Sequence, residues 1–364
     1  MNLHIVSDNV FINKFYDNLQ ELGILSNNRI VVRTNSKKLK YIQQNVPFAK
    51  LYSSQFNALI GDTSFYNKVY IHQFTPLLYR WVANHDFKEL NWMVWGADLY
   101  NLPSVNTLLY EELTLAKYVK RNFSLQDFLY QAKVFIFHSN YRNEAYAKVK
   151  NVLTWMTSEY NFALHHLPSL KASNQFFFYE NQMPYQALDK IMMEEKGRIN
   201  NDPPIYILGN SSTSELNHLD AVEWMDREGV SANLCVPVSY GDAKYTRFLK
   251  KNLSFYKGGE VQFVDRHMNF QEYLQFLYKA DGLIMNNIRP QGYGNIFMMM
   301  YLGKKVFLNQ KNLSIPELNR SGLIWFPIKE MKGKSEINLL QNRSAVSTLL
   351  SHQTLLNVYG NLFS

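Results

Sequence analysis

The chain has 364 residues, of which 46% are hydrophobic and 19% charged, a composition typical of globular rather than disordered proteins. Its length favours two domains of roughly 150–200 residues each. The single cysteine, Cys235, excludes an internal disulfide and a cysteine-rich zinc site, while a net charge of +8 points to acidic partners without specifying them.

The sequence shows neither a signal-peptide pattern in its first residues nor a transmembrane segment. Residues 1–11 lack a basic segment followed by an apolar one, which argues against a signal peptide. No window reaches 18 uninterrupted apolar residues, the length expected of a transmembrane helix. Together with the single cysteine, these features predict a cytoplasmic protein that is free or rests on a membrane surface.

Short apolar strands alternate with helical stretches over the first half of the chain. Strands are expected at residues 3–6, 29–32, 68–72, 91–95, 133–137 and 161–167. Helices are expected near residues 10–21, 76–84, 107–131 and 140–149. This alternation is typical of βαβ units and predicts a parallel sheet.

The alternation stops and then restarts. Residues 168–204 are polar and mixed, with one short helix expected at 186–196. Further strands are expected at residues 205–208, 233–238, 260–264, 282–286, 305–309 and 323–326. The pattern predicts an α/β protein with two Rossmann-like domains facing each other across a cleft. We assign residues 1–168 to the N-terminal domain, 169–203 to a linker and 204–364 to the C-terminal domain, with the last helix free to pack back on the first domain.

Polar side chains follow three strands of the first domain, where parallel sheets bind ligands. Asp8 follows the first strand and His72 ends the third, while Asp98 comes just after Gly96 turns the chain. Helix capping is the alternative interpretation for such residues. Asp98 is the main catalytic candidate because residues 99–103 do not begin a clean helix, and His72 and Asp8 are reserves.

The first strand of the second domain ends in a small polar loop before a helix that begins near Glu215. Such a loop presents backbone N–H groups and hydroxyls at a positive helix end, where a phosphate is favoured. No Gly-Lys-Ser/Thr follows, so it is not a P-loop, and capping alone also explains these residue types. The predicted donor-binding residues here are Gly209, Asn210, Ser211 and Ser212.

A second loop precedes a strongly apolar helix. Its glycines permit close approach of a ligand, and an arginine can add a fork suited to a diphosphate. The alternative is a glycine-rich turn with a surface arginine. Tyr240, at the end of another strand, is expected to pack on a base or ribose, or to be a core tyrosine. The predicted donor-binding residues of this loop are Arg289, Gln291, Gly292, Gly294 and Asn295.

Several common catalytic motifs are missing. No Asp-x-Asp, HExxH or Cys-x-x-Cys occurs, so we expect neither a dedicated metal site nor another cofactor. No Gly-x-Ser-x-Gly elbow of a serine hydrolase is found either.

Residues 114–150 are locally basic. A solvated helix face with a buried stripe and a surface that rests on anionic lipid are both open interpretations. Nucleic-acid binding is the weaker alternative because no motif for it is present. The basic residues are Lys117, Lys120, Arg121, Lys133, Arg142, Lys148 and Lys150, with Tyr118, Phe123, Phe128 and Tyr130 among them.

Five short motifs together resemble a known family. They are WGADLY at 95–100, LGNSS at 208–212 with His218 after it, VPVSYG at 236–241, RPQGYG at 289–294 and VFLN at 306–309. In the same order, they are similar to the bacterial TDP-N-acetylfucosamine:lipid II N-acetylfucosaminyltransferases of glycosyltransferase family 56. That family adds 4-acetamido-4,6-dideoxygalactose to an undecaprenyl-diphosphate-linked glycan during synthesis of enterobacterial common antigen.

The resemblance implies a GT-B fold, with the nucleotide held mainly by the C-terminal domain. We therefore expect a metal-independent glycosyltransferase, peripheral on the inner face of the cell membrane, that moves an N-acetylfucosamine-like sugar from TDP to a lipid-linked saccharide or other glycan. Asp98 would reach across the cleft to activate the acceptor hydroxyl or hold the sugar. The alternatives are a nucleotide-sugar epimerase of GT-B type and a non-enzymatic nucleotide- or sugar-binding protein.

Overall fold

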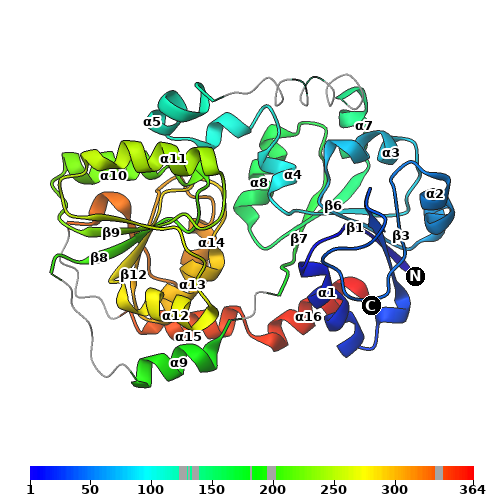
Figure 1. Ribbon diagram of the computed structural model, residues 1–364. Helices are drawn as coiled ribbons and strands as arrows, with labels where there is room; N and C mark the ends of the chain where they lie inside the picture. Colours follow the sequence, from blue (N-terminus) through cyan, green and yellow to red (C-terminus); the bar gives the residue numbers. More distant parts are fainter. Residues whose placement is uncertain (123–128, 130–131, 133–138, 181–182, 195–201, 333–338) are drawn as a thin grey trace. The chain divides into compact units, whose positions relative to one another are not determined.

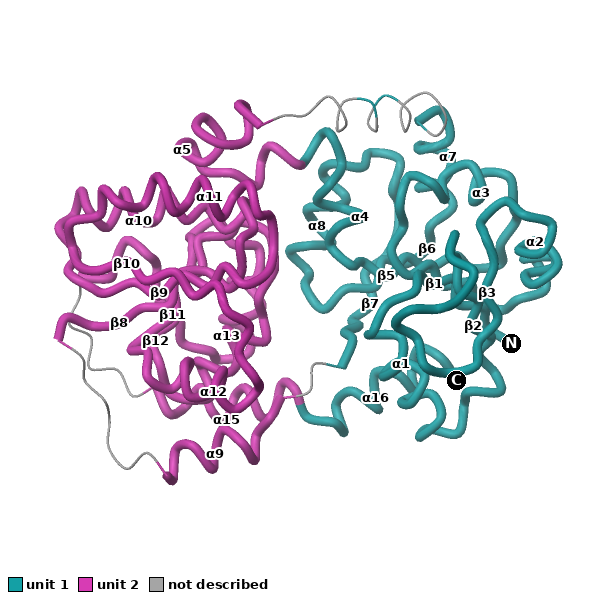
Figure 2. The backbone as a smooth tube through the Cα atoms, in the orientation of Figure 1, with its two compact units in different colours: residues 1–105, 124–180, 351–364 teal, residues 106–123, 181–350 magenta. Residues whose placement is uncertain are grey.

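The computed structural model describes the chain except for residues 123–128, 130–131, 133–138, 181–182, 195–201 and 333–338. It forms two compact units (Figure 2). Unit 1 comprises residues 1–105, 124–180 and 351–364, and unit 2 comprises residues 106–123 and 181–350. Residues 106–123 lie in the second unit, outside the sequence-based bounds of that domain, whereas 351–364 joins the first unit, as the sequence analysis allowed for the last helix.

Unit 1 is built on a parallel seven-stranded sheet with the strand order β3-β2-β1-β4-β5-β6-β7 (Figure 1). The chain adds β2 and β3 on one side of β1 and then returns to add β4 on the other side. A topological switch point therefore lies between β1 and β4. The strands are β1 (Asn2–Ser7), β2 (Asn28–Arg33), β3 (Phe48–Ala49), β4 (Val69–His72), β5 (Leu90–Met93), β6 (Val149–Thr154) and β7 (Ser173–Phe176).

Helices of unit 1 connect these strands, and the last helix of the chain completes its core. Phe363 of that helix lies 5.3 Å from Phe15 between ring centroids, and its carbonyl accepts a hydrogen bond from the Asn28 side chain at 2.9 Å. The helices are α1 (Phe11–Glu21), α2 (Ser54–Ile60), α3 (Tyr79–Ala83), α4 (Ala97–Tyr100), α7 (Arg142–Ala147), α8 (Thr157–His166) and α16 (His352–Phe363).

The structure differs from the sequence-based assignments at two places in this unit. Residues 161–166 of the strand expected at 161–167 belong to helix α8, whose buried Glu159 and Ala163 are four residues apart on one face. Strands β6 and β7 were not expected, since their sequences VKNVLT and SNQF contain few apolar residues. The strand expected at 133–137 lies outside the described residues.

Unit 2 is built on a parallel six-stranded sheet with the order β10-β9-β8-β11-β12-β13. Five of these strands coincide with expected ones to within a residue at either end, whereas β13 is only two residues long and shares only Phe326 with the strand expected at 323–326. The strands are β8 (Ile205–Leu208), β9 (Asn233–Pro237), β10 (Val261–Val264), β11 (Gly282–Met285), β12 (Lys305–Leu308) and β13 (Phe326–Pro327).

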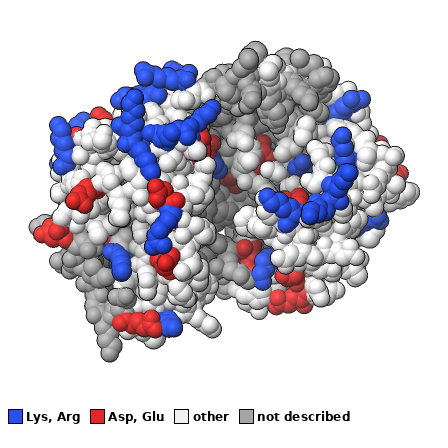
Figure 3. All heavy atoms as spheres, in the orientation of Figure 1, with Lys and Arg blue, Asp and Glu red and all other residues white. Residues whose placement is uncertain are grey.

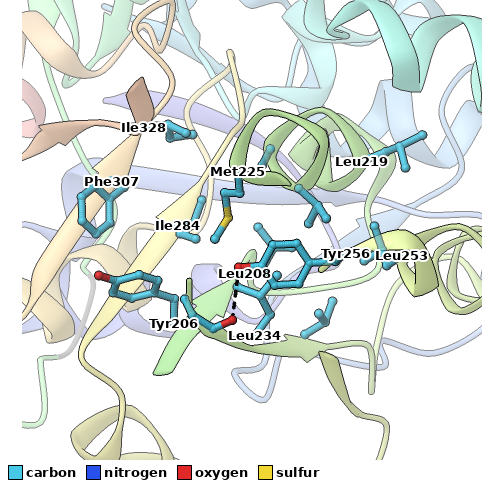
Figure 4. Packing of buried hydrophobic residues seen from close by; sticks show 14 of the residues in the cluster. Tyr206, Leu208, Leu219, Met225, Leu234, Leu253, Tyr256, Ile284, Phe307 and Ile328 are labelled. Carbon is cyan, nitrogen blue, oxygen red and sulfur yellow. Dashed lines mark hydrogen bonds between the residues drawn. The ribbon is translucent and has the colours of Figure 1, made fainter. Parts of the chain in front are cut away.

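Helices cover both faces of this sheet, with α10 and α11 on one face and α12 and α13 on the other (Figure 1). The core beneath α10 and α11 packs Leu219 and Met225 against Leu234, Ile284 and the other side chains of Figure 4. The helices are α5 (Glu112–Thr114), α9 (Tyr185–Glu194), α10 (His218–Arg227), α11 (Ala243–Asn252), α12 (Phe270–Lys279), α13 (Tyr293–Tyr301), α14 (Ile315–Arg320) and α15 (Gln341–Leu349). In the described ranges, no helix is both long and apolar enough to cross a membrane.

The segment 106–123 is held in unit 2 by buried polar contacts with α10. The Asp220 carboxylate accepts hydrogen bonds from the backbone N–H groups of Leu113 and Thr114, at 2.7 and 3.0 Å. The buried Asn217 side chain accepts from the backbone N–H of Glu111 at 3.0 Å and donates to the Leu109 carbonyl. These contacts explain why this part of the chain leaves unit 1.

Candidate functional site

The loop that follows β8 turns at a glycine that no other residue can replace without movement. Gly209 has φ of 71°, a left-handed conformation that L-residues rarely adopt. A Cβ atom there would lie 2.5 Å from His218 Nε2, at the start of α10. The backbone of this loop therefore rests directly on the first residue of the helix, whose N-terminus carries a partial positive charge.

The β8 loop is joined to the loop that follows β9. Ser212 donates its backbone N–H to the Tyr240 carbonyl at 2.9 Å and receives the N–H of Asp242 at 2.8 Å. The Asn210 side chain donates to the Tyr240 hydroxyl at 3.0 Å, while the Ser211 hydroxyl bonds to that of Thr213. Tyr240 is 58% exposed, so it is not a core tyrosine and its ring is available to a ligand.

The loop between β11 and α13 lies against the β8 loop. Gly292 has φ of 72°, and a Cβ atom there would lie 2.6 Å from Met285 Cε and 3.2 Å from the Asn210 side chain. Asn295 accepts a hydrogen bond from the Tyr273 hydroxyl at 2.6 Å. Gly294 lies within the first turn of α13, so Gly292 alone of the two glycines has the left-handed backbone.

Arg289 has a carboxylate partner. Its Nε donates to Glu215, and the two side chains are only 22% and 14% exposed. The surface arginine of the alternative interpretation is therefore not what the structure contains. The pair links the loop before α13 to the turn before α10, so the Arg289 charge is at least partly balanced within the protein.

Three buried polar atoms around these loops have no hydrogen-bond partner in the described part of the chain. They are His218 Nε2, Asn287 Oδ1 and Gln291 Nε2. Burial lowers the pKa of His218 to about 3, so its imidazole is neutral. Unpartnered polar atoms are costly inside a protein, and they commonly mark a place where a ligand or water completes the set. Of the three, Asn287 escaped sequence analysis because it looks like a strand-end cap.

Asp98 is not in an open loop as expected but in helix α4, and it is only 2% exposed. Its Oδ2 accepts hydrogen bonds from the Phe74 backbone N–H at 2.8 Å and from the Trp92 indole at 2.6 Å. Its Oδ1 accepts from the Trp95 backbone N–H at 3.0 Å. Burial raises the pKa of Asp98, and these donors partly offset the rise. The contacts favour an architectural role, and a catalytic one stays a prediction.

His72 takes part in a buried chain of hydrogen bonds. Its Nδ1 contacts the Tyr179 hydroxyl, which also accepts from the Trp95 indole at 2.7 Å, and its Nε2 lies 3.0 Å from His4 Nδ1. His4 Nε2 faces the Asn28 amide oxygen, an acceptor, so each neutral ring donates through Nε2. Burial lowers the pKa values of both histidines, to about 4 for His4.

The third catalytic candidate, Asp8, holds a loop of unit 1. Its carboxylate accepts the backbone N–H groups of Lys40, Tyr41 and Ile42 at 2.6–3.0 Å. Burial acts to raise the pKa of Asp8, but these hydrogen bonds outweigh it and the pKa is lowered. The structure thus brings the predicted donor-binding residues together in unit 2, whereas Asp8, His72 and Asp98 make separate sets of contacts in unit 1.

A family model described as 4-alpha-L-fucosyltransferase, glycosyl transferase group 56, matches residues 9–344. The chain belongs to this family. It is a glycosyltransferase, as the sequence motifs predicted, and the match extends well beyond them toward both ends of the chain.

Solved structures with a similar fold are also glycosyltransferases of the GT-B type. A sucrose-phosphate synthase from Thermosynechococcus elongatus has a TM-score of 0.57 at 11% identity, covering 100% of this chain and 98% of that one. The UDP-forming trehalose-phosphate synthase of Burkholderia vietnamiensis has a TM-score of 0.55 at 10% identity, covering 100% and 98%. Anabaena HepE, in complex with UDP and glucose, has a TM-score of 0.53 at 12% identity, covering 99% and 98%. The predicted GT-B fold is confirmed.

Proposed function

We propose that this group 56 glycosyltransferase moves an N-acetylfucosamine-like deoxy-amino sugar from a TDP-sugar to a lipid-linked saccharide. The observation that carries the proposal is the meeting of three strand-end loops at one edge of the unit 2 sheet, with unpartnered polar atoms around them. The family, a 4-alpha-L-fucosyltransferase group, supports a fucose-type sugar. The TDP donor and the lipid-linked acceptor are proposed in addition to what the family match shows.

The diphosphate would lie at the loops of Gly209 and Gly292, whose left-handed backbones let the two loops turn tightly and pack on His218 and Asn210. The N-terminus of α10 and the Arg289 guanidinium supply positive charge to the leaving group. Gln291 Nε2 offers a hydrogen-bond donor at the same loop, and the exposed ring of Tyr240 offers a surface for the base or ribose. Departure of the nucleotide would then be assisted by protein groups rather than by a metal ion.

A basic surface on unit 2 supports work at the inner face of the cell membrane. Tyr118 packs on α11, with ring centroids 4.7 Å from Tyr245 and 5.0 Å from Phe248. This packing brings the exposed Lys117, Lys120 and Arg121 beside the basic residues of α11, where cationic side chains gather (Figure 3). Such a surface attracts anionic lipid headgroups.

The surface is smaller than the sequence predicted. Lys133 lies outside the described residues, whereas Lys148 donates to the carbonyls of Ala83 and His85. Arg142, Lys148 and Lys150 belong to unit 1, so residues 114–150 do not form one element.

The donor site can be tested with a pair of glycine variants. Gly292→Ala adds a methyl group 3.2 Å from Asn210 and 2.6 Å from Met285 Cε, so it should separate the two loops and weaken TDP binding at least tenfold. Gly322→Ala is the control, because Gly322 has nearly the same φ, 69°, with nothing within 4 Å of the added Cβ. Equal TDP affinity in the two variants, measured by calorimetry, would argue against nucleotide binding at these loops.

The reaction itself requires a panel of nucleotide sugars with and without a polyprenyl-diphosphate saccharide. Transfer of a deoxy-amino sugar only when acceptor is present supports the proposal. Isomerisation of the donor without acceptor would instead identify an epimerase, and binding with no turnover in either case would identify a binding protein.

A further inference from the structure

Several polar groups lie at the switch point of the unit 1 sheet, where β1 and β4 end. Ser7 ends β1, Arg33 ends the neighbouring β2, and Gln73 follows β4. The Ser7 hydroxyl donates to the Gln73 side-chain oxygen at 3.2 Å, and Arg33 Nη2 donates to the Gln73 carbonyl at 3.1 Å. Thr75 donates its backbone N–H to the same carbonyl at 2.9 Å. Four residues from the ends of three strands therefore meet where open parallel sheets bind ligands.

Two of these groups have unused hydrogen-bonding capacity. Arg33 Nε and Thr75 Oγ1 are buried and have no partner in the described part of the chain. A guanidinium carries five N–H donors, and that of Arg33 uses one, toward Gln73. Leaving a buried donor unpaired is unfavourable, and a bound acceptor would remove that cost.

The charge of Arg33 is also incompletely balanced. Burial lowers the pKa of Arg33 to about 10 while the Asp98 charge raises it, so the side chain is a cation at neutral pH. Asp98 directs its oxygens at three N–H donors of its own, and Asp8 binds the backbone of residues 40–42. Within the described ranges Arg33 forms no ion pair with a carboxylate. Because its side chain is partly exposed, an oxyanion can reach it.

The backbone at this point favours the same kind of ligand. Gln73 has φ of 69°, a strained conformation for a residue other than glycine, of a kind that clusters at ligand sites. Helix α1 begins at Phe11, four residues after β1 ends, so its positive end lies at the same edge of the sheet. Cation, hydroxyls and helix end together suit a tetrahedral oxyanion rather than a neutral sugar.

We propose that Arg33, Thr75 and Ser7 form a phosphate-binding site in unit 1, separate from the nucleotide loops of unit 2. This inference rests on the proposed function in one respect, namely that the acceptor carries a diphosphate, which this site would hold. A free phosphate or pyrophosphate presents the same chemistry. The site would recognise the acceptor by its charge and leave the saccharide free to vary.

The test measures binding of inorganic pyrophosphate and of farnesyl diphosphate by titration calorimetry, with saturating TDP present so that the diphosphate-binding loops proposed in unit 2 are occupied. Arg33→Gln removes the cation, and Thr75→Val replaces the unpartnered hydroxyl with a methyl group of similar size. Arg29→Gln is the matched control, since it removes the same charge from the same strand four residues earlier. We expect the first two variants to bind both ligands at least tenfold more weakly and the control to bind like the wild type.

Stability measurements separate ligand binding from folding. Thr75→Val should keep or raise Tm, because it removes a buried hydroxyl that has no partner. Loss of binding without loss of Tm therefore supports the site even if Arg33→Gln folds poorly. Loss of pyrophosphate binding alone, with farnesyl diphosphate not bound by any variant, supports a site for free phosphate.

Affinities within twofold of wild type for both ligands, in both Arg33→Gln and Thr75→Val, would overturn the proposal. Neither ligand contains a nucleotide or a donor sugar, so this result is independent of whether TDP-sugar transfer occurs. Conversely, failure of transfer with normal pyrophosphate binding would count against the proposed reaction and not against this site.

Discussion

Replacing Asp98 by asparagine distinguishes an architectural from a catalytic carboxylate. The amide oxygen of asparagine can keep the Oδ2 position, where it still accepts from Phe74 and Trp92. The amide nitrogen then faces the backbone N–H of Trp95, so an acceptor 3.0 Å away becomes a second donor. A donor left unpaired in a site this buried costs about 1–3 kcal/mol.

Two further effects of Asp98→Asn oppose each other. The two retained hydrogen bonds lose their charge and become weaker. Removing the charge also removes the free-energy cost of burying it, which is the cost that raises the pKa of Asp98. We therefore expect a net loss of about 1–3 kcal/mol, which for a unit of this size lowers Tm by roughly 2–12 °C.

Scanning calorimetry of the whole chain would measure this change, and TDP affinity should not change if the loops proposed to bind the nucleotide, which lie in unit 2, do so. The matched control is Asp62→Asn, an exposed cap of the backbone N–H of Ser64, where asparagine caps about as well. Its Tm should equal that of the wild type. If Asp98→Asn instead kept the wild-type Tm while transfer fell by about 10²-fold, the scale typical of a positioned acid or base, the architectural argument would be refuted.

The other predictions concern pH, a buried hydroxyl, metals and lipid. Burial lowers the pKa of His4 from 6.5 to about 4, so the free energy of unfolding should fall by on the order of 3 kcal/mol as the pH drops through that range. A free energy of unfolding, measured with urea, that does not change between these pH values would contradict this. Tyr179→Phe should lower Tm because it leaves the Trp95 indole N–H and His72 Nδ1 without their hydrogen-bond partner. An unchanged Tm would count against the buried chain of hydrogen bonds. EDTA should leave the transfer rate unchanged. Loss of transfer in EDTA that manganese restores would show a metal requirement. Replacing Lys117, Lys120 and Arg121 by Glu should weaken co-sedimentation with anionic vesicles without changing Tm. Unchanged co-sedimentation would indicate that these residues form only a solvated helix face.

The second half of the fold was readable from sequence because its strands are short, apolar and bounded by polar loops. Strand β8, with the sequence IYIL, is buried on both faces, so its apolar run has no competing interpretation. Strand β7, with the sequence SNQF, pairs only with β6 at the edge of its sheet and carries no comparable signal. The path of residues 106–123 was not predictable either, because it depends on Asp220 and Asn217, which are distant in sequence.

For the candidate site, the sequence identified the loops at 209–212 and 289–295 but not the partners that each side chain contacts. The glycines of the two phosphate-type loops were recognisable because a left-handed backbone restricts the residue type. The pairing of Arg289 with Glu215 joins residues 74 positions apart, and no local pattern reveals it. Asp98 looked available because its donor Phe74 is 24 residues away and because sequence does not show that the Trp92 indole turns toward the carboxylate.

These contacts divide the polar groups at the strand ends into two kinds. The carboxylates of Asp8, Asp98 and Asp220 each accept several N–H bonds from protein, so their charge is committed to the fold. Of the strand-end groups with unused capacity in the described part of the chain, Arg33 Nε in unit 1 and Gln291 Nε2 in unit 2 can only donate. Thr75 Oγ1 and His218 Nε2 can donate or accept, and Asn287 Oδ1 accepts. A surface that offers donors and helix ends stabilises negative charge rather than abstracting a proton. The residues described at these edges thus fit binding of phosphate groups and departure of a nucleotide better than they fit activation of an acceptor by a protein base.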